Sequence, residues 1–356
     1  MKIYFYVAYP YYYPHFIPIG NYFSTKGHEV VYILSSKQNS ENMEHIAKEN
    51  NLKYSFEEEK LYAKNADIVF LANRYENILK ISATKILLEH GIGTKNLKNF
   101  YSFIKDIDIY LIEGEYQYEK MLKKYPEYKD KLKIVGFSKF DEMMNSKIYN
   151  KETLYKKYNL DSTKKTILYA PTFFPSSIEK MKDDFPHEFQ HCNIIIKPHY
   201  LSYERKKYKN QRKKFKKWNE YENCTILPLN EYNIIPLFVI SDVMISDESS
   251  AMFEFAALNK PVISNRYFKL RWSYYLMPWK LSKRIDNSKD FYRKILDNAY
   301  SYAETVSYVK EALVNPQKLE EKRMEFSKDL CGIIDGKVSH RIYEEALKRV
   351  KSKDEI

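Results

Sequence analysis

The sequence lacks the cysteine content of disulfide-rich secreted domains and the long apolar runs of integral membrane proteins. It has 3 cysteines among 356 residues, and Cys192, Cys224 and Cys331 stand far apart with no metal-ligand spacing. An odd, scattered set argues against a disulfide framework and against a metal site. No stretch approaches about 18 consecutive apolar residues, so we expect no transmembrane helix. The start, MKIYFYVAYPYYYPHF, has no small-residue cleavage site, and we expect a buried strand there, in a cytoplasmic chain, rather than a signal peptide.

Signatures of nucleic-acid-binding modules are also absent, although the net charge is +12 and there are 34 tyrosines. The sequence has no helix-turn-helix, RNP-type or zinc-finger pattern, so we expect no nucleic-acid partner. Part of the positive excess reflects a composition rich in Lys, Asn, Tyr and Ile. Much of the rest gathers in RKKYKNQRKKFKKW, Arg205 to Trp218, where Tyr208, Phe215 and Trp218 fall on one helical face. This stretch is either a solvated surface helix or a contact with an anionic membrane.

Short apolar runs alternate with longer amphipathic stretches through most of the chain. Residues 2–9, 28–34, 66–72, 84–91, 107–114 and 131–141 form a first series of expected strands, and residues 165–172, 193–200, 223–230, 241–250 and 260–265 form a second. Segments long enough for a helix separate most of them, which is typical of βαβ units and parallel sheets. We therefore expect an α/β protein with two successive parallel-sheet domains, divided by the polar, lysine-rich stretch around residues 145–165.

Polar clusters follow several of the expected strands, at the strand ends where open parallel sheets bind ligands. In ILLEHGIGTK, His90 directly follows a strand, Gly91 and Gly93 permit a tight turn, and Lys95 lies five residues beyond the histidine. A histidine can take up a proton near neutral pH, so His90 is a candidate general base. The alternative is a histidine that only ends a strand.

A second cluster consists of Lys197 and His199 in IIIKPHY, where Pro198 stiffens the exit from a strand of isoleucines. Two cationic or hydrogen-bond-donating side chains on a rigid turn suit an anionic ligand. The alternative is an exposed turn with no ligand.

The third cluster is the loop SDESS, between a short apolar strand and an expected helix over residues 249–259. Ser249 or Ser250 suits the N-cap position, and two hydroxyls at a helix N-terminus also suit phosphate oxygens. Asp247 and Glu248 would repel a phosphate unless they bind loop amides or point away from it. Glu254 falls about one turn into the helix, within reach of a ribose hydroxyl at the N-terminus.

Several of these segments together resemble one enzyme family. ILYAPT, IIIKPH, SDVMISDESSAMFEFAALNKPVI and DGKVSHRI look like segments of the CDP-glycerol glycerophosphotransferase family, whose members build or prime teichoic acids and related capsular polymers. EHGIGTK is similar to the family's Trp-His-Gly-Thr-x-x-Lys element, and VGFSKFD to its Gly-x-Pro-Arg-x-Asp turn. The resemblance covers most of residues 85–345.

The resemblance implies a GT-B fold, in which two Rossmann-like domains face a central cleft. Residues 1–150 would form the acceptor-side domain, residues 151–335 the nucleotide-donor domain, and residues 336–356 a final helix that packs back across the cleft. The implied reaction transfers glycerol phosphate from CDP-glycerol to an acceptor hydroxyl and releases CMP. The acceptor would be lipid-linked or an oligosaccharide, and the enzyme would lie in the cytoplasm or at the inner face of the membrane.

The resemblance also implies roles for individual residues. His90 would be the general base, and His199 with Lys197 would stabilise the diphosphate. Ser249 and Ser250 would hold a donor phosphate at the helix N-terminus, Glu254 would bind the ribose, and Thr172 and Asp247 would belong to the same donor-binding site. Gly91, Lys95 and Gly136 would line the cleft. No metal and no cofactor are implied, because fixed hydrogen-bond donors supply the charge stabilisation.

The sequence departs from the family pattern at the presumed pocket, namely at Glu89, Ile92, Ser138, Lys139, Phe173, Phe174 and Glu248. These changes leave the identity of the transferred group open. CDP-ribitol is an alternative donor, and a GT-B glycosyltransferase or epimerase that uses a UDP-sugar is an alternative enzyme. Single addition and polymerisation also both stay open.

Overall fold

The computed structural model describes residues 1–37, 40–89, 91–92, 101–144, 148–270, 272, 274 and 292–354, which form two compact units. The first unit comprises Met1–Ile148 and Lys328–Ile356, and the second comprises Tyr149–Ser327. The sequence predicts the second boundary at residue 335, and the structure places it earlier. The reason is close packing, because a Cβ on Gly114 would lie 2.4 Å from the carbonyl oxygen of Asp329.

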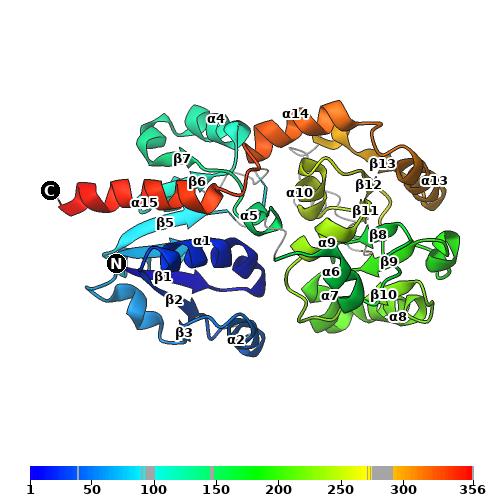
Figure 1. Ribbon diagram of the computed structural model, residues 1–356, viewed down its shortest axis with the longest axis horizontal. Coiled ribbons are helices and arrows are strands. Elements are labelled where there is room, and N and C mark those ends of the chain that lie inside the picture. Colours follow the sequence, from blue (N-terminus) through cyan, green and yellow to red (C-terminus); the bar gives the residue numbers. More distant parts are fainter. Residues whose placement is uncertain are drawn as a thin grey trace. The chain divides into compact units, whose positions relative to one another are not determined.

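The first unit contains a seven-stranded sheet in the order β3-β2-β1-β4-β5-β6-β7 (Figure 1). Its strands are β1 (Lys2–Val7), β2 (Glu29–Leu34), β3 (Tyr54–Ser55), β4 (Ile68–Leu71), β5 (Thr84–Leu88), β6 (Ile109–Ile112) and β7 (Leu132–Ile134). All neighbouring strands are parallel. The strand order reverses between β1 and β4, which is where doubly wound sheets form a ligand crevice.

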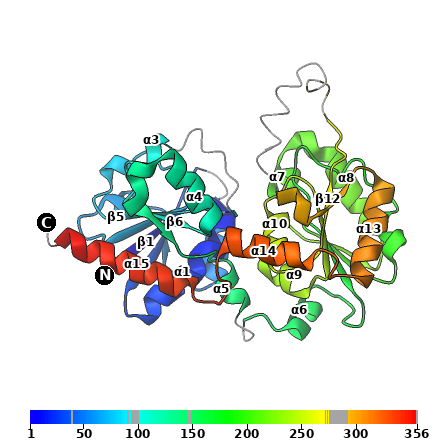
Figure 2. The same ribbon diagram turned by 90° about the horizontal axis from the view of Figure 1, so that it is seen from above.

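The helices of the first unit are α1 (Tyr13–Thr25), α2 (Ser40–Glu49), α3 (Tyr101–Ile104), α4 (Glu115–Lys124), α5 (Phe140–Met143) and α15 (Val338–Asp354). They lie between these strands in the sequence, apart from α5 and α15, which follow the last strand. The C-terminal helix α15 lies beside α1 (Figure 2), and Tyr343 packs against Phe23 with ring centroids 5.1 Å apart. Among the described residues, α15 therefore packs on α1, β5 and β6 of the first unit.

The second unit contains a six-stranded sheet in the order β10-β9-β8-β11-β12-β13. Its strands are β8 (Thr166–Tyr169), β9 (Asn193–Ile196), β10 (Cys224–Ile226), β11 (Val243–Ser246), β12 (Val262–Asn265) and β13 (Asp297–Ala299), and all neighbours are parallel. This order reverses between β8 and β11, so the second unit repeats the topology of the first. The prediction of two Rossmann-like parallel-sheet domains is confirmed.

The helices of the second unit are α6 (Lys151–Lys157), α7 (Tyr200–Glu204), α8 (Lys209–Trp218), α9 (Ile235–Ile240), α10 (Ala251–Ala257), α13 (Tyr302–Val314) and α14 (Glu320–Cys331), the last of which ends in the first unit. Trp218 of α8 is fully buried in the core, and its indole N–H donates to the carbonyl of Lys182 at 2.9 Å. Tyr208 and Phe215 are buried as well. The three aromatic residues of Arg205–Trp218 are thus all buried, and they cannot contact a membrane.

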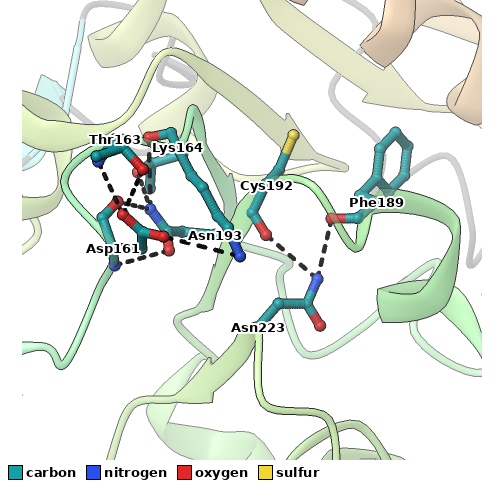
Figure 3. A network of polar contacts seen from close by, with 8 residues as sticks. Asp161, Thr163, Lys164, Phe189, Cys192, Asn193 and Asn223 are labelled. Atoms are coloured by element: carbon teal, nitrogen blue, oxygen red, sulfur yellow. Dashed lines mark hydrogen bonds and ion pairs between the residues drawn. The ribbon is translucent and has the colours of Figure 1, made fainter.

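Side-chain amides hold the amino ends of two strands in the second unit, at the edge opposite the carboxyl ends of the strands (Figure 3). The Asn193 amide donates to the carbonyl of Asp161 at 2.8 Å, and the Asn223 amide donates to the carbonyls of Phe189 and Cys192 at 3.0 and 3.2 Å. These contacts fix the starts of β9 and β10, so the strand ends on the other side are also placed. Among the described residues, no helix has both the length and the apolar character needed to cross a membrane.

Candidate functional site

The polar clusters of the second unit meet at the carboxyl edge of its sheet. The loop after β8 contains Thr172 and Phe173, the turn after β9 contains Lys197 and His199, and the loop after β11 begins at Asp247. Because β8 lies between β9 and β11, these three segments are neighbours at the reversal of the strand order. The structure therefore brings the predicted donor-binding residues of this unit together.

His199 is held as a neutral imidazole with one defined tautomer. Its Nδ1 accepts a hydrogen bond from the amide of Leu201 at 3.2 Å, which leaves Nε2 to carry the proton. Burial, together with the positive charges of Lys197 and Arg205, lowers the pKa of His199 to about 4. Phe173 and Tyr200 pack on its ring with centroids 4.7 Å away. His199 can therefore present a fixed, uncharged N–H donor at neutral pH.

Lys197 leaves the same strand and is partly buried. Its ammonium donates to the backbone carbonyl of Glu231 at 2.8 Å. This bond fixes the direction of the side chain. The result is a positioned positive charge two residues before His199.

Asp247 organises the loop after β8. Its carboxylate accepts from the amide of Thr172 at 2.6 Å, from the hydroxyl of Ser176 at 3.0 Å, and from the amide and hydroxyl of Ser177 at 3.1 and 3.2 Å. The side chain is fully buried. Burial raises the pKa of Asp247 to about 7, and the hydrogen bonds from Thr172 and Ser177 oppose this shift. Asp247 thus holds loop amides, which is one of the two roles that the sequence leaves open for it.

Glu248 forms an ion-pair cluster that sequence reasoning does not find. It accepts from Arg293 at 2.9 and 2.8 Å and from Arg266 at 2.7 Å. The side chains of Glu248 and Arg293 are almost fully buried, whereas Arg266 is 18% exposed. The two arginines compensate the carboxylate, so the negative charge expected to repel a phosphate is neutralised. The partners lie 18 and 45 residues away, and no local pattern signals them.

The two serines occupy the start of α10, a helix of seven residues. Ser250 is the N-cap residue and makes no side-chain capping bond, whereas the hydroxyl of Ser249 accepts from the amide of Ala251 at 3.3 Å. Both serines are partly exposed. Glu254 is 2% exposed within the same helix, so it lies in the interior next to the serine loop.

The site residues predicted in the first unit are only partly described. His90 and Lys95 lie outside the described residues. Glu89 directly follows β5 and accepts from the hydroxyl of Tyr110 at 2.9 Å, and Gly91 and Ile92 are buried just beyond it. Glu89 is thus a buried, hydrogen-bonded carboxylate next to the predicted base in sequence.

Gly136 has a packing function within the first unit. Its φ is +98°, and a Cβ there would lie 2.9 Å from Val338 and 3.2 Å from Arg341 of the α15 region. Asp141, five residues further along the same turn, accepts from the amides of Val338 and Ser339 at 3.0 and 2.6 Å. The turn VGFSKFD therefore packs against the first residues of α15 and hydrogen-bonds to them. No group of His, Cys, Asp or Glu side chains in the described part of the chain has the arrangement of a metal site.

Two doubly wound units, with polar side chains gathered at a strand-order reversal, define a protein of the GT-B class. The fold is similar to that of a variant of the wall teichoic acid polymerase TagF, with a TM-score of 0.74 and 18% identity over 100% of this chain and 90% of that chain. The family model described as CDP-Glycerol:Poly(glycerophosphate) glycerophosphotransferase matches residues 79–348, and the chain belongs to this family.

Curated relatives give the same assignment at low identity. The chain is 26% identical over 231 residues to the teichoic acid poly(ribitol-phosphate) polymerase of Bacillus spizizenii, covering 58% of this chain and 31% of that protein. It is 23% identical over 291 residues to the teichoic acid glycerol-phosphate transferase of Staphylococcus aureus, covering 76% and 67%. The chain thus spans about a third of the length of the first relative. The relatives include proteins named for ribitol phosphate and for glycerol phosphate.

Proposed function

We propose that the chain transfers a glycerol phosphate unit from CDP-glycerol to an acceptor hydroxyl in the assembly of a cell-surface polymer, and releases CMP. The observation that carries this proposal is the family match over residues 79–348, with His199 held as a neutral donor at the strand-order reversal of the second unit. An anionic diphosphate needs fixed donors that do not have to reorganise during the reaction.

The proposed step is a displacement at the phosphorus that carries glycerol. The acceptor oxygen forms a new P–O bond, the bond from that phosphorus to the bridging oxygen breaks, and CMP leaves with the electron pair. The proton of the acceptor hydroxyl passes to His90, the predicted base. Negative charge grows on the CMP phosphate, so donors in its neighbourhood stabilise the transition state more than the ground state.

His199 and Lys197 have distinct roles in this proposal. His199 donates through Nε2 to a diphosphate oxygen, and its low pKa means that it acts as a hydrogen-bond donor and not as an acid at neutral pH. Lys197, fixed on the carbonyl of Glu231, supplies positive charge. The partly exposed hydroxyls of Thr172, Ser249 and Ser250 supply further donors.

Asp247 and Glu248 are positioning residues in this proposal. Asp247 holds the loop that carries Thr172 and Phe173, and Phe173 in turn packs on the His199 ring. Glu248 keeps Arg266 and Arg293 at the same edge of the sheet. Glu254 is assigned to the ribose by the family resemblance, and its side chain is 2% exposed in the helix that follows the serine loop.

The basic stretch Arg205–Trp218 supports a further element of the proposal, a purely electrostatic contact with an anionic membrane. Its aromatic residues are buried, but Arg205 and Lys206, Lys207, Lys209, Lys213, Lys216 and Lys217 are exposed. Exposed lysines near a surface of anionic lipid each contribute about 1 kcal/mol to binding. Such a contact would bring the enzyme to a lipid-linked acceptor at the inner face of the membrane.

The proposal is tested by CMP release from CDP-glycerol, with CDP-ribitol and UDP-N-acetylglucosamine as competing donors. We expect turnover with CDP-glycerol and a loss of about 100-fold in kcat for His199→Ala, the size typical of a lost transition-state donor. His199→Gln, which keeps an N–H donor, should retain part of the activity. His191→Ala, an exposed histidine before β9, is the matched control.

One result would overturn the donor assignment, and another would overturn only the role of His199. Release of UDP from the UDP-sugar, without use of either CDP-polyol, would favour the glycosyltransferase or epimerase alternative. Turnover of His199→Ala at the wild-type rate would remove His199 from the proposed site while leaving the donor identity intact.

A further inference from the structure

The first unit has a pocket of about 200 Å³ at the carboxyl edge of its sheet. The pocket lies at the reversal of the strand order, between the segment Tyr6–Tyr12 that ends and follows β1 and the loop Asn73–Asn77 that follows β4. Its lining residues fall between positions 6 and 77, whereas the family match begins at residue 79. The pocket is therefore a feature of this chain that the family assignment does not describe.

Tyrosine rings form much of the pocket wall. Tyr6 and Tyr75 meet edge to face with centroids 4.7 Å apart, and Tyr9 meets Tyr12 in the same way at 5.7 Å. Tyr9 also stacks on Tyr11 at 5.2 Å and stays partly exposed. Aromatic faces of this kind pack against the C–H face of a sugar ring, while a few polar groups select its orientation.

Glu58 is the fixed polar group of the pocket. Its two carboxylate oxygens accept from the hydroxyl of Tyr6 at 3.3 Å and from the hydroxyl of Tyr75 at 3.1 Å. Burial raises the pKa of Tyr6 to about 12 and that of Tyr75 above its usual range, so both phenols keep their protons. Asn73 and Asn77 add amides that both donate and accept. This mixture suits the vicinal hydroxyls of a saccharide.

The charges around the pocket cancel. The lining has the cations Lys37 and Arg74 and the carboxylates Glu58 and Glu76, and Lys37 pairs with Glu76 at 3.2 Å. The chain as a whole carries +12, so the pocket does not share the positive excess. A neutral ligand with many hydroxyls fits these groups better than a polyanion such as a glycerol phosphate chain.

We propose that this pocket binds an uncharged sugar unit of the acceptor. The inference rests on the proposed transfer reaction and narrows its acceptor to a glycan end. Strand β5 lies next to β4, with Leu87 opposite Leu71, and continuing this register places Glu89 opposite Asn73. A sugar in the pocket would thus lie one strand away from the segment that leads into the predicted base. Such an enzyme adds polyol phosphate to a sugar and does not use an existing polyol phosphate chain as its acceptor.

Saturation-transfer NMR and calorimetry on the full chain test this inference with N,N′-diacetylchitobiose, cellobiose and a glycerol phosphate trimer as probes. We expect at least one neutral disaccharide to bind and the trimer to bind more weakly. Tyr9→Ala and Glu58→Gln should each weaken disaccharide binding at least tenfold. Disaccharide binding is also measured for Asn77→Ala. Asn77 is an exposed lining residue, so a change in binding there would not come from altered packing. Tyr300→Ala, at an exposed tyrosine of the second unit, is the control.

The inference is overturned if neither disaccharide binds, if the trimer binds more tightly, or if binding is the same in all pocket variants. CMP release from CDP-glycerol, measured in parallel, separates this result from the proposed function. Turnover of CDP-glycerol without disaccharide binding would disprove the sugar pocket and leave the proposed reaction standing. If wild type binds a disaccharide, Tyr9→Ala does not, and no CDP-polyol is turned over, the proposed reaction would be disproved and the sugar site would stand.

Discussion

At the scale of single residues, His199 is a histidine that the fold holds in its neutral form. The Leu201 amide occupies Nδ1, and burial beside Lys197 and Arg205 keeps the ring neutral. Because the ring is neutral above about pH 4, Nδ1 can accept from Leu201 and the single ring proton stays on Nε2. The sequence predicts His199 as an anion contact, but its tautomer depends on a turn geometry that the residue order alone does not specify.

The low pKa of His199 predicts a pH dependence of stability. The unfolded chain takes up a proton on this residue below about pH 6.5, whereas the folded chain does so only near pH 4. Stability therefore falls as the pH falls through this window. Thermal unfolding at pH 7 and pH 5 should show a smaller loss for His199→Gln than for wild type, while His191→Gln should follow wild type. An equal loss in all three proteins would contradict the neutral, buried assignment.

Asp247 predicts a large effect from a small substitution. In Asp247→Asn, the amide NH₂ replaces one oxygen that accepts from Ser176 and Ser177, and the donors of these buried residues face another donor. Each buried polar group left without a partner costs about 1–3 kcal/mol. We expect a loss of about 2–4 kcal/mol in the free energy of unfolding. Denaturant titration measures it, with the exposed Asp184→Asn as control, and a loss below that of the control would contradict the role of Asp247 as the centre of the loop.

At the scale of elements, most of the strands are predictable because their sequences are short apolar runs. The buried strands β1, β4, β9 and β11 have the sequences KIYFYV, IVFL, NIII and VMIS. The edge strands β3 and β13 have the sequences YS and DNA, which are too short for an alternating pattern and, apart from Tyr54, contain no strand-favouring residue. They pair because a neighbouring strand offers free backbone groups, which is a tertiary effect. The Glu248–Arg293 pair is unpredictable for a similar reason, since its 45-residue separation carries no periodic signal.

The turn before α5 predicts a difference between two glycines with positive φ. Gly136 has a φ of +98° and close neighbours on α15, whereas Gly27 has a φ of +80° and nothing within 4 Å of its added Cβ. In both Gly→Ala variants the free energy of unfolding should fall by about 1 kcal/mol, because alanine is strained at a positive φ. In Gly136→Ala it should fall by about 1–3 kcal/mol more, because the new Cβ clashes with Val338. Chemical denaturation of the two variants checks this difference. Equal losses would show that the turn does not hold α15.

At the scale of the whole molecule, the basic stretch Arg205–Trp218 predicts an electrostatic and reversible membrane contact. Binding to vesicles with anionic lipid should weaken as salt rises, because exposed charges are screened. Trp218 is fully buried, so its fluorescence should stay unchanged on binding. Changing Lys206, Lys207 and Lys209 to Glu should abolish binding, and the same change at the exposed Lys123, Lys124 and Lys129 is the charge-matched control. If the two triple variants weaken vesicle binding equally, binding depends on the net charge of the protein and not on this stretch.

The central claim is that the second unit binds a cytidine diphosphate donor at its strand-order reversal. Calorimetric titration with CMP, CDP-glycerol, CDP-ribitol, UDP and UDP-N-acetylglucosamine tests it most directly, on wild type and on the double variant Ser249→Ala/Ser250→Ala. We predict that the cytidine ligands bind more tightly than the uridine ligands, and that the double variant loses most of this binding. Preference for the uridine ligands, or unchanged binding of CDP-glycerol in the double variant, would contradict the account.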